Sequence, residues 1–450
     1  MTLKKAFIYT IGIFGLITLL SYFANAQTRK LSLNEALGLT LANNRGIKIS
    51  SLDVDRSSES IRIAKSAALP SAGLSTGVAH YFYETPFFGI GNNGGSNTNK
   101  IPFDRFGGRD QATAIAWVTQ PVYNAATRPS ILNAQLQERE SRLALHGNEV
   151  NTAALLRQTY IRILVLRERL KLQHESLERN LRALQDAKYL LVQGRALRVD
   201  TLRAYTSVKN LEPDLLRLSY AIEVGKQQLK TLTGLDSLRD IELTDSLIFP
   251  VTVPVLSEED VYNEARTNRP DLLSLDLQQQ KADQQIKIAA AGMKPTVSAT
   301  AQYMIQTQTN HFDYLNAFYP STPFVGAQLN VPIFSGNSNK AKVKQAVIEK
   351  DQSVIRSKQA YEDLRTEVKK AVANLLETAA RIQTSANVKE TAKLSYEITQ
   401  YRYANAVASR LELTDAELAL TAAQSNYLEA VYDYLSARIE IERTMGKIGK

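Results

Sequence analysis

The sequence predicts an α+β membrane protein in which a transmembrane β-barrel is continued by a long antiparallel coiled-coil α-barrel, with the chain internally duplicated. Three observations support this prediction. Apolar residues recur every seven positions over long segments, shorter segments alternate apolar and polar residues, and the two halves of the 450-residue chain share landmarks in the same order. A seven-residue period is typical of coiled-coil helices, and alternation over about ten residues is typical of membrane-crossing strands.

The N-terminus has the three parts of a secretory signal peptide. Two lysines near the start supply positive charge, residues 7–20 form a short apolar segment, and Ala24-Asn25-Ala26 resembles a cleavage site. A transmembrane anchor is the alternative, but the apolar run is short for a span of about 20 residues. We therefore expect residues 1–26 to be a signal peptide that is removed.

Composition excludes several classes of function. The chain has no cysteine, which excludes disulfides, thiolate metal sites and cysteine nucleophiles. Beyond the signal peptide no run of 18 apolar residues occurs, so a membrane crossing would need a closed barrel. The net charge of +9 falls to +7 without Lys4 and Lys5, and the remaining basic residues interleave with acidic ones along the helices. Such charges form a solvated face, so we expect no nucleic-acid partner.

Landmarks of the first half recur in the second half. Residues 31–70 and 256–295 correspond at a constant offset of 225, and later landmarks correspond at offsets of 211 to 212. The corresponding pairs include Ser32 with Ser257, Asn43 with Asn268, Pro70 with Pro295, Gly194 with Asn405, and Gly234 with Gly446. We interpret the chain as two copies of one unit, residues 27–250 and 251–450, each with helices, two strands and a long helical hairpin.

Heptads dominate the helical part of each copy. The repeating positions are Leu156, Ile163, Leu170, Leu177, Leu184 and Leu191 in the first copy, and Val347, Val354, Tyr361, Val368, Leu375 and Ile382 in the second. This period makes helices pack as left-handed supercoils. Residues 129–193 could form one helix about 100 Å long, which suits a rod or a tunnel better than a globule. Pro213 should kink or break the helix that follows.

The long helices are predicted to reverse at two turns. The first is Gly194-Arg195-Ala196-Leu197 and the second is Asn405-Ala406-Val407-Ala408. Glycine and asparagine tolerate left-handed backbone geometry at a helix end. Each chain would therefore have two antiparallel hairpins with exposed turns, which are either plain loops or surfaces for docking and gating.

Two segments of each copy read as strands, at residues 71–83 and 111–120 and at residues 296–308 and 324–333. In residues 296–308 alternate positions are apolar, and Met304 interrupts the polar set between them. A half-buried soluble sheet also alternates, but aromatic residues gather near the strand ends, as at a membrane interface. Four strands cannot close a membrane barrel, so several chains must associate, and three would supply twelve strands.

The sequence contains no recognisable catalytic or metal-binding pattern. The four histidines lack metal-ligand spacing, and Gly89-Ile90-Gly91 lies in a predicted loop rather than at a helix start. No P-loop or nucleophilic serine motif occurs. We therefore expect neither enzymatic activity nor a cofactor.

Together these features resemble the TolC-like outer-membrane efflux family over residues 31–446. The specific parts are Leu31-Ser32-Leu33-Asn34-Glu35-Ala36-Leu37, the prolines Pro70 and Pro295, Pro332-Ile333-Phe334-Ser335-Gly336, and the two turns. The resemblance implies a homotrimer with a twelve-stranded barrel in the outer-membrane lipid of a Gram-negative cell, extending into the periplasm as an α-barrel. It implies a passive duct that works with a periplasmic adaptor protein and an inner-membrane transporter, in efflux or type I secretion.

The resemblance also assigns adaptor contact and gating to the turns. The positions it indicates are Gly194, Arg195, Arg198, Asp200, Arg402, Asn405, Val407, Arg410, Glu412 and Asp415. Our hypothesis is that some of these arginines pair with Asp200 or Glu412 to hold a closed state. Solvated surface pairs worth about 0–1 kcal/mol are the alternative.

The second turn departs from the family pattern. Asn405 replaces the usual glycine, and Leu411 and Thr414 stand where some relatives carry a ring of aspartates. Glu412 and Asp415 lie one residue further on and are the candidates to replace that ring.

A structural protein is the competing class. A secreted coiled-coil stalk or adhesin without channel activity would share the heptads, but it would not explain two copies that each carry a strand pair. Within the channel class, drugs, proteins and metal ions all remain open as substrates. Four methionines and no cysteine argue mildly against dedicated handling of soft metals.

Overall fold

The computed structural model describes residues 29–83, 86–87, 104–105, 108–235, 240–247, 257–312, 314–405 and 407–448. The predicted signal peptide lies outside these residues. The chain divides into two compact units, one with the segments up to Val54, Glu140–Asp276 and Arg356–Lys450, and the other with Asp55–Arg139 and Leu277–Ile355. Each unit therefore combines segments from both halves of the sequence.

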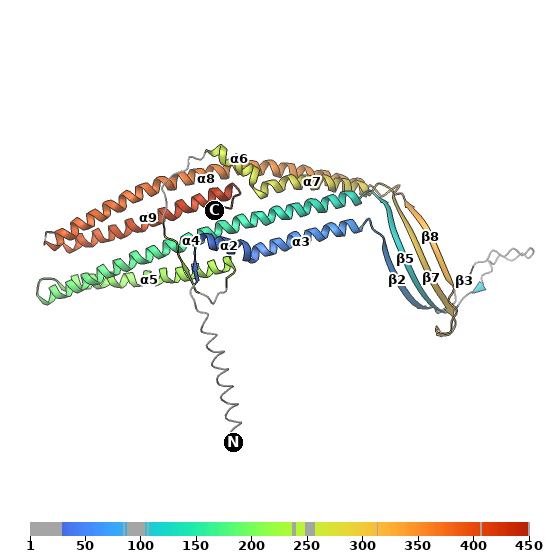
Figure 1. Ribbon diagram of the computed structural model, residues 1–450, viewed down its shortest axis with the longest axis horizontal. Helices are drawn as coiled ribbons and strands as arrows, with labels where there is room; N and C mark the ends of the chain where they lie inside the picture. The colour runs from blue at the N-terminus through green and yellow to red at the C-terminus, as the bar shows by residue number, and fades with distance from the viewer. Residues whose placement is uncertain are drawn as a thin grey trace, which may run out of the picture. The chain divides into compact units, whose positions relative to one another are not determined.

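Four long strands of the second unit form one antiparallel sheet (Figure 1). Its order is β2 (Ser71–His80), β5 (Asp110–Asn124), β7 (Thr296–Thr309) and β8 (Ser321–Asn330). Two short strands, β3 (Pro86–Phe87) and β4 (Asp104–Arg105), pair separately. The long strands lie near the predicted segments, but β2 ends three residues earlier, β5 extends to Asn124, four residues further, and β8 begins and ends three residues earlier. β8 ends at Asn330, and as an edge strand it accommodates Pro323 opposite Tyr303.

The register of this sheet gathers apolar side chains on one face. Val118 pairs with Ala301, and Ala301 pairs with Val325. Residues directly paired across strands point to the same face. The shared face therefore carries Leu74, Val78, Ala114, Ala116, Val118, Val297, Ala299, Ala301, Tyr303, Ile305, Val325, Ala327 and Leu329. The opposite face carries Ser75, Thr113, Ser298, Thr300, Gln302, Gln306 and Gln328, together with the apolar residues Ile115, Trp117, Met304 and Phe324.

Two antiparallel helical hairpins supply most of the first unit (Figure 1). The first pairs α4 (Thr127–Val192) with α5 (Arg198–Thr233), and the second pairs α8 (Ser338–Ala404) with α9 (Arg410–Thr444). Predicted heptad residues lie in their cores, including Leu156, Ile163, Leu184, Val368, Leu375 and Ile382. Pro213 neither breaks nor ends α5, which continues through it as one helix.

Shorter elements pack against the hairpins. Strand β1 (Arg29–Leu31) pairs in parallel with β6 (Ile241–Leu243). Helices α2 (Leu33–Asn43) and α3 (Arg45–Ser66) precede the sheet strand β2, and α6 (Glu258–Asn268) and α7 (Pro270–Ala291) precede β7. Within the described residues, no helix contains an apolar stretch of the length that a membrane-crossing helix requires.

Two glycines make equivalent close contacts at the ends of the hairpins. Gly234 follows α5 with a φ of 68°, and Gly446 follows α9 with a φ of 74°. A Cβ on Gly234 would lie 2.8 Å from the carbonyl oxygen of Asn43, and one on Gly446 would lie 3.0 Å from that of Asn268. Each glycine thus contacts the last residue of a short helix. A side chain there would be disfavoured both by the positive φ and by the close contact with the carbonyl oxygen.

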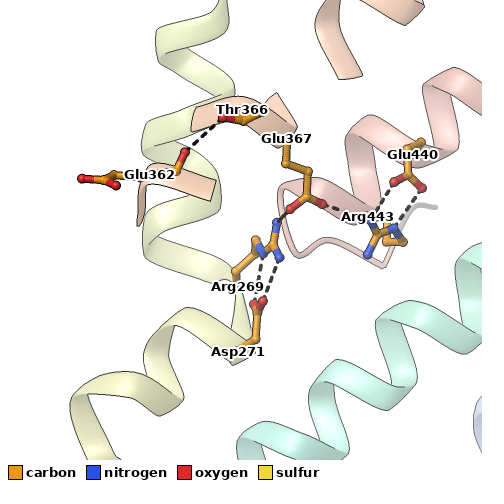
Figure 2. A network of polar contacts seen from close by, with 7 residues as sticks. All are labelled: Arg269, Asp271, Glu362, Thr366, Glu367, Glu440 and Arg443. Atoms are coloured by element: carbon orange, nitrogen blue, oxygen red, sulfur yellow. Dashed lines mark hydrogen bonds and ion pairs between the residues drawn. The ribbon is translucent and has the colours of Figure 1, made fainter. Parts of the chain in front are cut away.

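A polar network joins the α6–α7 junction to both helices of the second hairpin (Figure 2). Arg269 donates to Asp271 and to Glu367 at 2.7 Å each. Arg443 donates to Glu367 at 3.1 Å and to Glu440 at 2.6 Å. Burial opposes the charge on Arg269, but the hydrogen bonds to the two carboxylates raise its pKa overall. Burial likewise opposes the charge on Asp271, yet the bond from Arg269 holds the pKa of that carboxyl below its usual value.

Candidate functional site at the turns of the two hairpins

The first turn, between α4 and α5, closes through a glycine in the left-handed conformation. Gly194 has a φ of 69°, and the N–H of Arg195 donates to the carbonyl oxygen of Leu190 at 2.8 Å. The N–H of Leu197 donates to the Asp200 carboxylate at 3.1 Å, so Asp200 caps the start of α5. The glycine reversal expected from the sequence is present.

The second turn, between α8 and α9, closes differently. Asn337 is the one non-glycine residue of the described chain with a positive φ, so the expectation of left-handed geometry at Asn405 is wrong. The Asn405 side-chain amide donates to the carbonyl oxygen of Tyr401 at 2.9 Å, and the N–H of Val407 donates to that of Arg402 at 2.8 Å. These bonds satisfy the free carbonyls at the end of α8 without a left-handed residue.

A capping box begins α9 and extends into an ion pair. Ser409 Oγ accepts from the N–H of Glu412 at 3.2 Å, and Glu412 accepts from the N–H of Ser409 at 3.3 Å. The other carboxylate oxygen of Glu412 lies 3.8 Å from Arg402 Nη1, and both side chains are half exposed. The hypothesised arginine–acid pair is therefore formed at the second turn. In the described part of the chain, no ion pair joins Arg195 or Arg198 to Asp200.

The starts of α5 and α9 line one small cavity of about 90 Å³. Its walls are Asp200, Arg203, Ala204, Ser207, Arg410, Leu411 and Thr414. Arg410 also lies over the ring of Tyr403, with its guanidinium carbon 5.8 Å from the ring centroid. Two predicted residues from different hairpins, Asp200 and Arg410, thus face the same space, whereas Asp415 lies exposed on α9.

Exposed apolar side chains gather at both turns. Val192 and Leu197 are exposed at the first turn, and Val407 and Leu411 at the second. Of these four, only Val407 was among the predicted site residues. Isolated apolar residues are ordinary on a surface, but a group at two turns is typical of an interaction site. The available signal was the presence of Leu197 and Val407 within the two turn segments themselves.

Glu417, two helical turns into α9, is a buried acid that the sequence analysis did not single out. Its exposed fraction is 6%, and its Oε2 has no hydrogen-bond partner. Burial raises the pKa of this carboxyl, although Arg410 and Arg179 oppose the rise. Its spacing in the sequence could have identified it as buried. Glu417 lies four residues after Leu413 and three before Leu420, both of which are buried on α9.

Comparison with known families gives one match that spans most of the chain. Residues 36–235 and 261–447 match the family described as outer membrane efflux protein.

Several individual relatives are distant in sequence but align over most of their length. The chain is 21% identical to the probable outer membrane lipoprotein SilC of Salmonella typhimurium, over 95% of this chain and 87% of SilC. It is 20% identical to the proteases secretion protein PrtF of Dickeya chrysanthemi, over 97% of this chain and 92% of PrtF. The solved structure of the CmeC outer membrane channel of Campylobacter jejuni matches with a TM-score of 0.75 at 15% identity, over 92% of this chain and 85% of CmeC. At this sequence identity, the similarity to the CmeC structure shows a shared fold alone.

Proposed function

Because the chain belongs to the outer membrane efflux protein family, we propose that it is the passive exit duct of a tripartite efflux or type I secretion system. It is an outer-membrane channel protein of a transport family. The observation that carries the proposal is a sheet with one apolar face, joined in one chain to long hairpins with exposed turns. A periplasmic adaptor protein and an inner-membrane transporter would deliver the substrate and the energy. The family match sets aside the stalk or adhesin alternative.

A homotrimer with a closed barrel is the assembly we infer. Strands β2 and β8 each pair on one side only, and open strand edges attract further strands. The smallest membrane barrels have about eight strands, so one four-stranded sheet is too small. If β8 of each chain paired with β2 of the next, three chains would close a barrel of twelve strands. Its apolar face would meet the lipid and its polar face the lumen.

We further propose that residues 27–250 and 251–450 are copies of one unit, preceded by the signal peptide at residues 1–26. The matching contacts of Gly234 with Asn43 and of Gly446 with Asn268 support this division. So do the caps of α2 and α6, where Ser32 Oγ accepts from Glu35 and Ser257 Oγ accepts from Asp260. Local contacts of this kind persist when a duplicated unit diverges.

The turns are the proposed surface for adaptor contact and gating. The proposed residues are Gly194, Arg195, Arg198, Asp200, Arg402, Asn405, Val407, Arg410, Glu412 and Asp415. Their support is the exposed apolar group at both turns and the Arg402–Glu412 pair, which ties the end of α8 to the start of α9.

Conductance tests the channel proposal. The protein would be extracted from membranes in detergent, weighed by native mass spectrometry and reconstituted in a planar bilayer. We expect a trimer that forms small, stable channels. A monomer or dimer without channel activity would refute the proposal.

The Arg402–Glu412 pair gives a prediction about gating. Arg402→Gln should raise the open fraction of reconstituted channels by up to about fivefold, because an exposed pair stabilises one state by about 0–1 kcal/mol. Arg182→Gln is the control, since it removes the same charge from an exposed ion pair of α4 outside the proposed site. Equal effects of the two variants would show that the loss of positive charge, and not the loss of the Arg402–Glu412 pair, changes the open fraction.

A further inference from the structure

Glu417 lies where three helices of the first unit meet. The Glu417 carboxylate interacts electrostatically with Arg410 two turns earlier on α9, with Arg179 on α4 and with Tyr396 on α8. Arg179 lies over the Tyr396 ring, with its guanidinium carbon 6.0 Å from the ring centroid. Burial raises the pKa of Tyr396, so this hydroxyl stays protonated at ordinary pH.

Glu417 and Arg179 each have buried side-chain atoms without a hydrogen-bond partner. Glu417 Oε2 is buried and accepts no hydrogen bond, and Arg179 Nε and Nη2 are buried and donate none. Leaving a buried charged group without partners is costly, and it is much less costly if the acid is neutral. The packed arrangement therefore suits a protonated Glu417.

Glu417 is itself one of the residues that line a cavity with mostly polar side chains, into which its carboxylate can turn. The cavity holds about 450 Å³ and lies between α4, α5 and α9. Its lining includes Ser176, Asn180, Ser207, Asn210, Thr414 and Thr421, whose hydroxyl and amide groups can donate to a carboxylate. Asp214 is the other acid in the lining, and it is paired with Arg217 at 3.0 Å.

We propose that Glu417 is a proton-operated latch between α9 and the helices α4 and α8. Protonated, the side chain stays packed among Leu413, Leu420 and Tyr396 and holds α9 in place. Ionised, it turns into the polar cavity or draws Arg179 toward it, and α9 loosens. Because α9 begins at the second turn, the latch sets the position of that turn.

The direction of the effect follows from the raised pKa of Glu417. A group whose pKa is higher in the packed state stabilises that state at low pH, and the contribution is lost as pH rises through that pKa. Acid therefore closes the latch and neutral pH releases it. Removing Arg179, whose charge opposes the rise, should move the transition to higher pH.

Hydrogen exchange of the full chain in detergent tests the latch directly. Exchange of peptides from α9 would be followed from about pH 4.5 to about pH 8, after division by the intrinsic rate at each pH. We expect the protection of residues 410–425 to fall across this range, about tenfold for each unit by which the packed and loosened states differ in pKa. Glu417→Gln should keep α9 protected at every pH.

Two further variants separate the latch from a general effect of charge. Glu429→Gln changes an exposed acid on the same helix and should leave the wild-type profile in place. Arg179→Gln should move the midpoint to higher pH, a result that does not depend on Glu417→Gln folding well. A flat wild-type profile, a pH response that survives in Glu417→Gln, or an unmoved midpoint in Arg179→Gln would overturn the latch.

The role of the latch in gating rests on the proposed channel function, and the two can fail separately. If exchange follows pH as expected but no variant conducts in bilayers, the latch stands and the channel proposal fails. If the protein conducts while α9 exchange ignores pH, the channel stands and the latch is refuted.

Discussion

Three glutamates of the second hairpin show how neighbours decide the role of one side chain. Glu412 is half exposed and caps α9 through Ser409. Glu367 accepts from Arg269 and Arg443 and so joins the α6–α7 junction to α8 and α9. Glu417 is buried with one oxygen unpaired. A glutamate carboxylate can therefore cap a helix, join helices or respond to protons, depending on the hydrogen-bond donors near it.

Among the residues of the polar network around Glu367, Arg269 is the one whose loss should lower stability most. Its side chain is 15% exposed and bonds two carboxylates. Arg269→Met should lower the stability of the extracted protein by about 2 kcal/mol, because hydrogen bonds to charged groups are worth about 1.5–3 kcal/mol and the carboxylates are left unpaired. The urea midpoint measures this change. Arg62→Met, which removes an exposed arginine paired with Glu59, is the control and should leave the midpoint in place. Equal shifts would mean that the network is not a stabilising one.

At the scale of elements, close approach between helices outweighs intrinsic helix preference. Helix α5 approaches α4 at Gly225, where a Cβ would lie 2.8 Å from Cγ1 of the fully buried Ile163. A Cβ added at Gly38 on α2 would instead have no atom within 4 Å. Both glycines lie inside helices, where alanine is intrinsically favoured by about 1 kcal/mol.

Alanine at these two positions should therefore have opposite effects. Gly225→Ala should destabilise the protein by about 1–3 kcal/mol, because added volume in a packed core forces neighbours to move. Gly38→Ala should stabilise it by about 0.5–1 kcal/mol. Thermal unfolding of the two variants in the same detergent compares them. A stabilising Gly225→Ala would contradict the close helix contact.

At the scale of the whole molecule, the sheet should have a lipid side and a water side. Val325 and Gln328 lie on the same strand, β8, but face opposite sides. Val325→Arg should reduce the amount of trimer in the outer-membrane fraction, because an arginine on a lipid face costs up to about 2–4 kcal/mol at the membrane midplane. Gln328→Arg adds the same charge to the other face and should assemble normally. Native gels of membrane fractions would show the difference, and equal loss in both variants would refute the assignment of faces.

Parts of the fold and the site followed from local sequence patterns. The heptads placed α4 within two residues at its start and one at its end, and alternation located all four long strands. Gly194 was recognised at the first turn, because a turn glycine acts on its immediate neighbours, whereas Asp200 was indicated by the family resemblance and its capping bond was not predicted. Asn405 was misjudged, because its side chain closed the turn by a bond that the local pattern does not reveal.

The sequence by itself determined the kinds of elements and their order, because periodicity and turn chemistry are local properties of the chain. Its motifs also resembled those of the outer-membrane efflux family, which the family match confirms. Only the tertiary structure decided which residues share a face or a pocket. The register that places Val118, Ala301 and Val325 together depends on pairing between distant strands. The burial of Glu417 beside Arg179 depends on the packing of two hairpins. Those contacts join residues far apart in the chain, so no local pattern contains them.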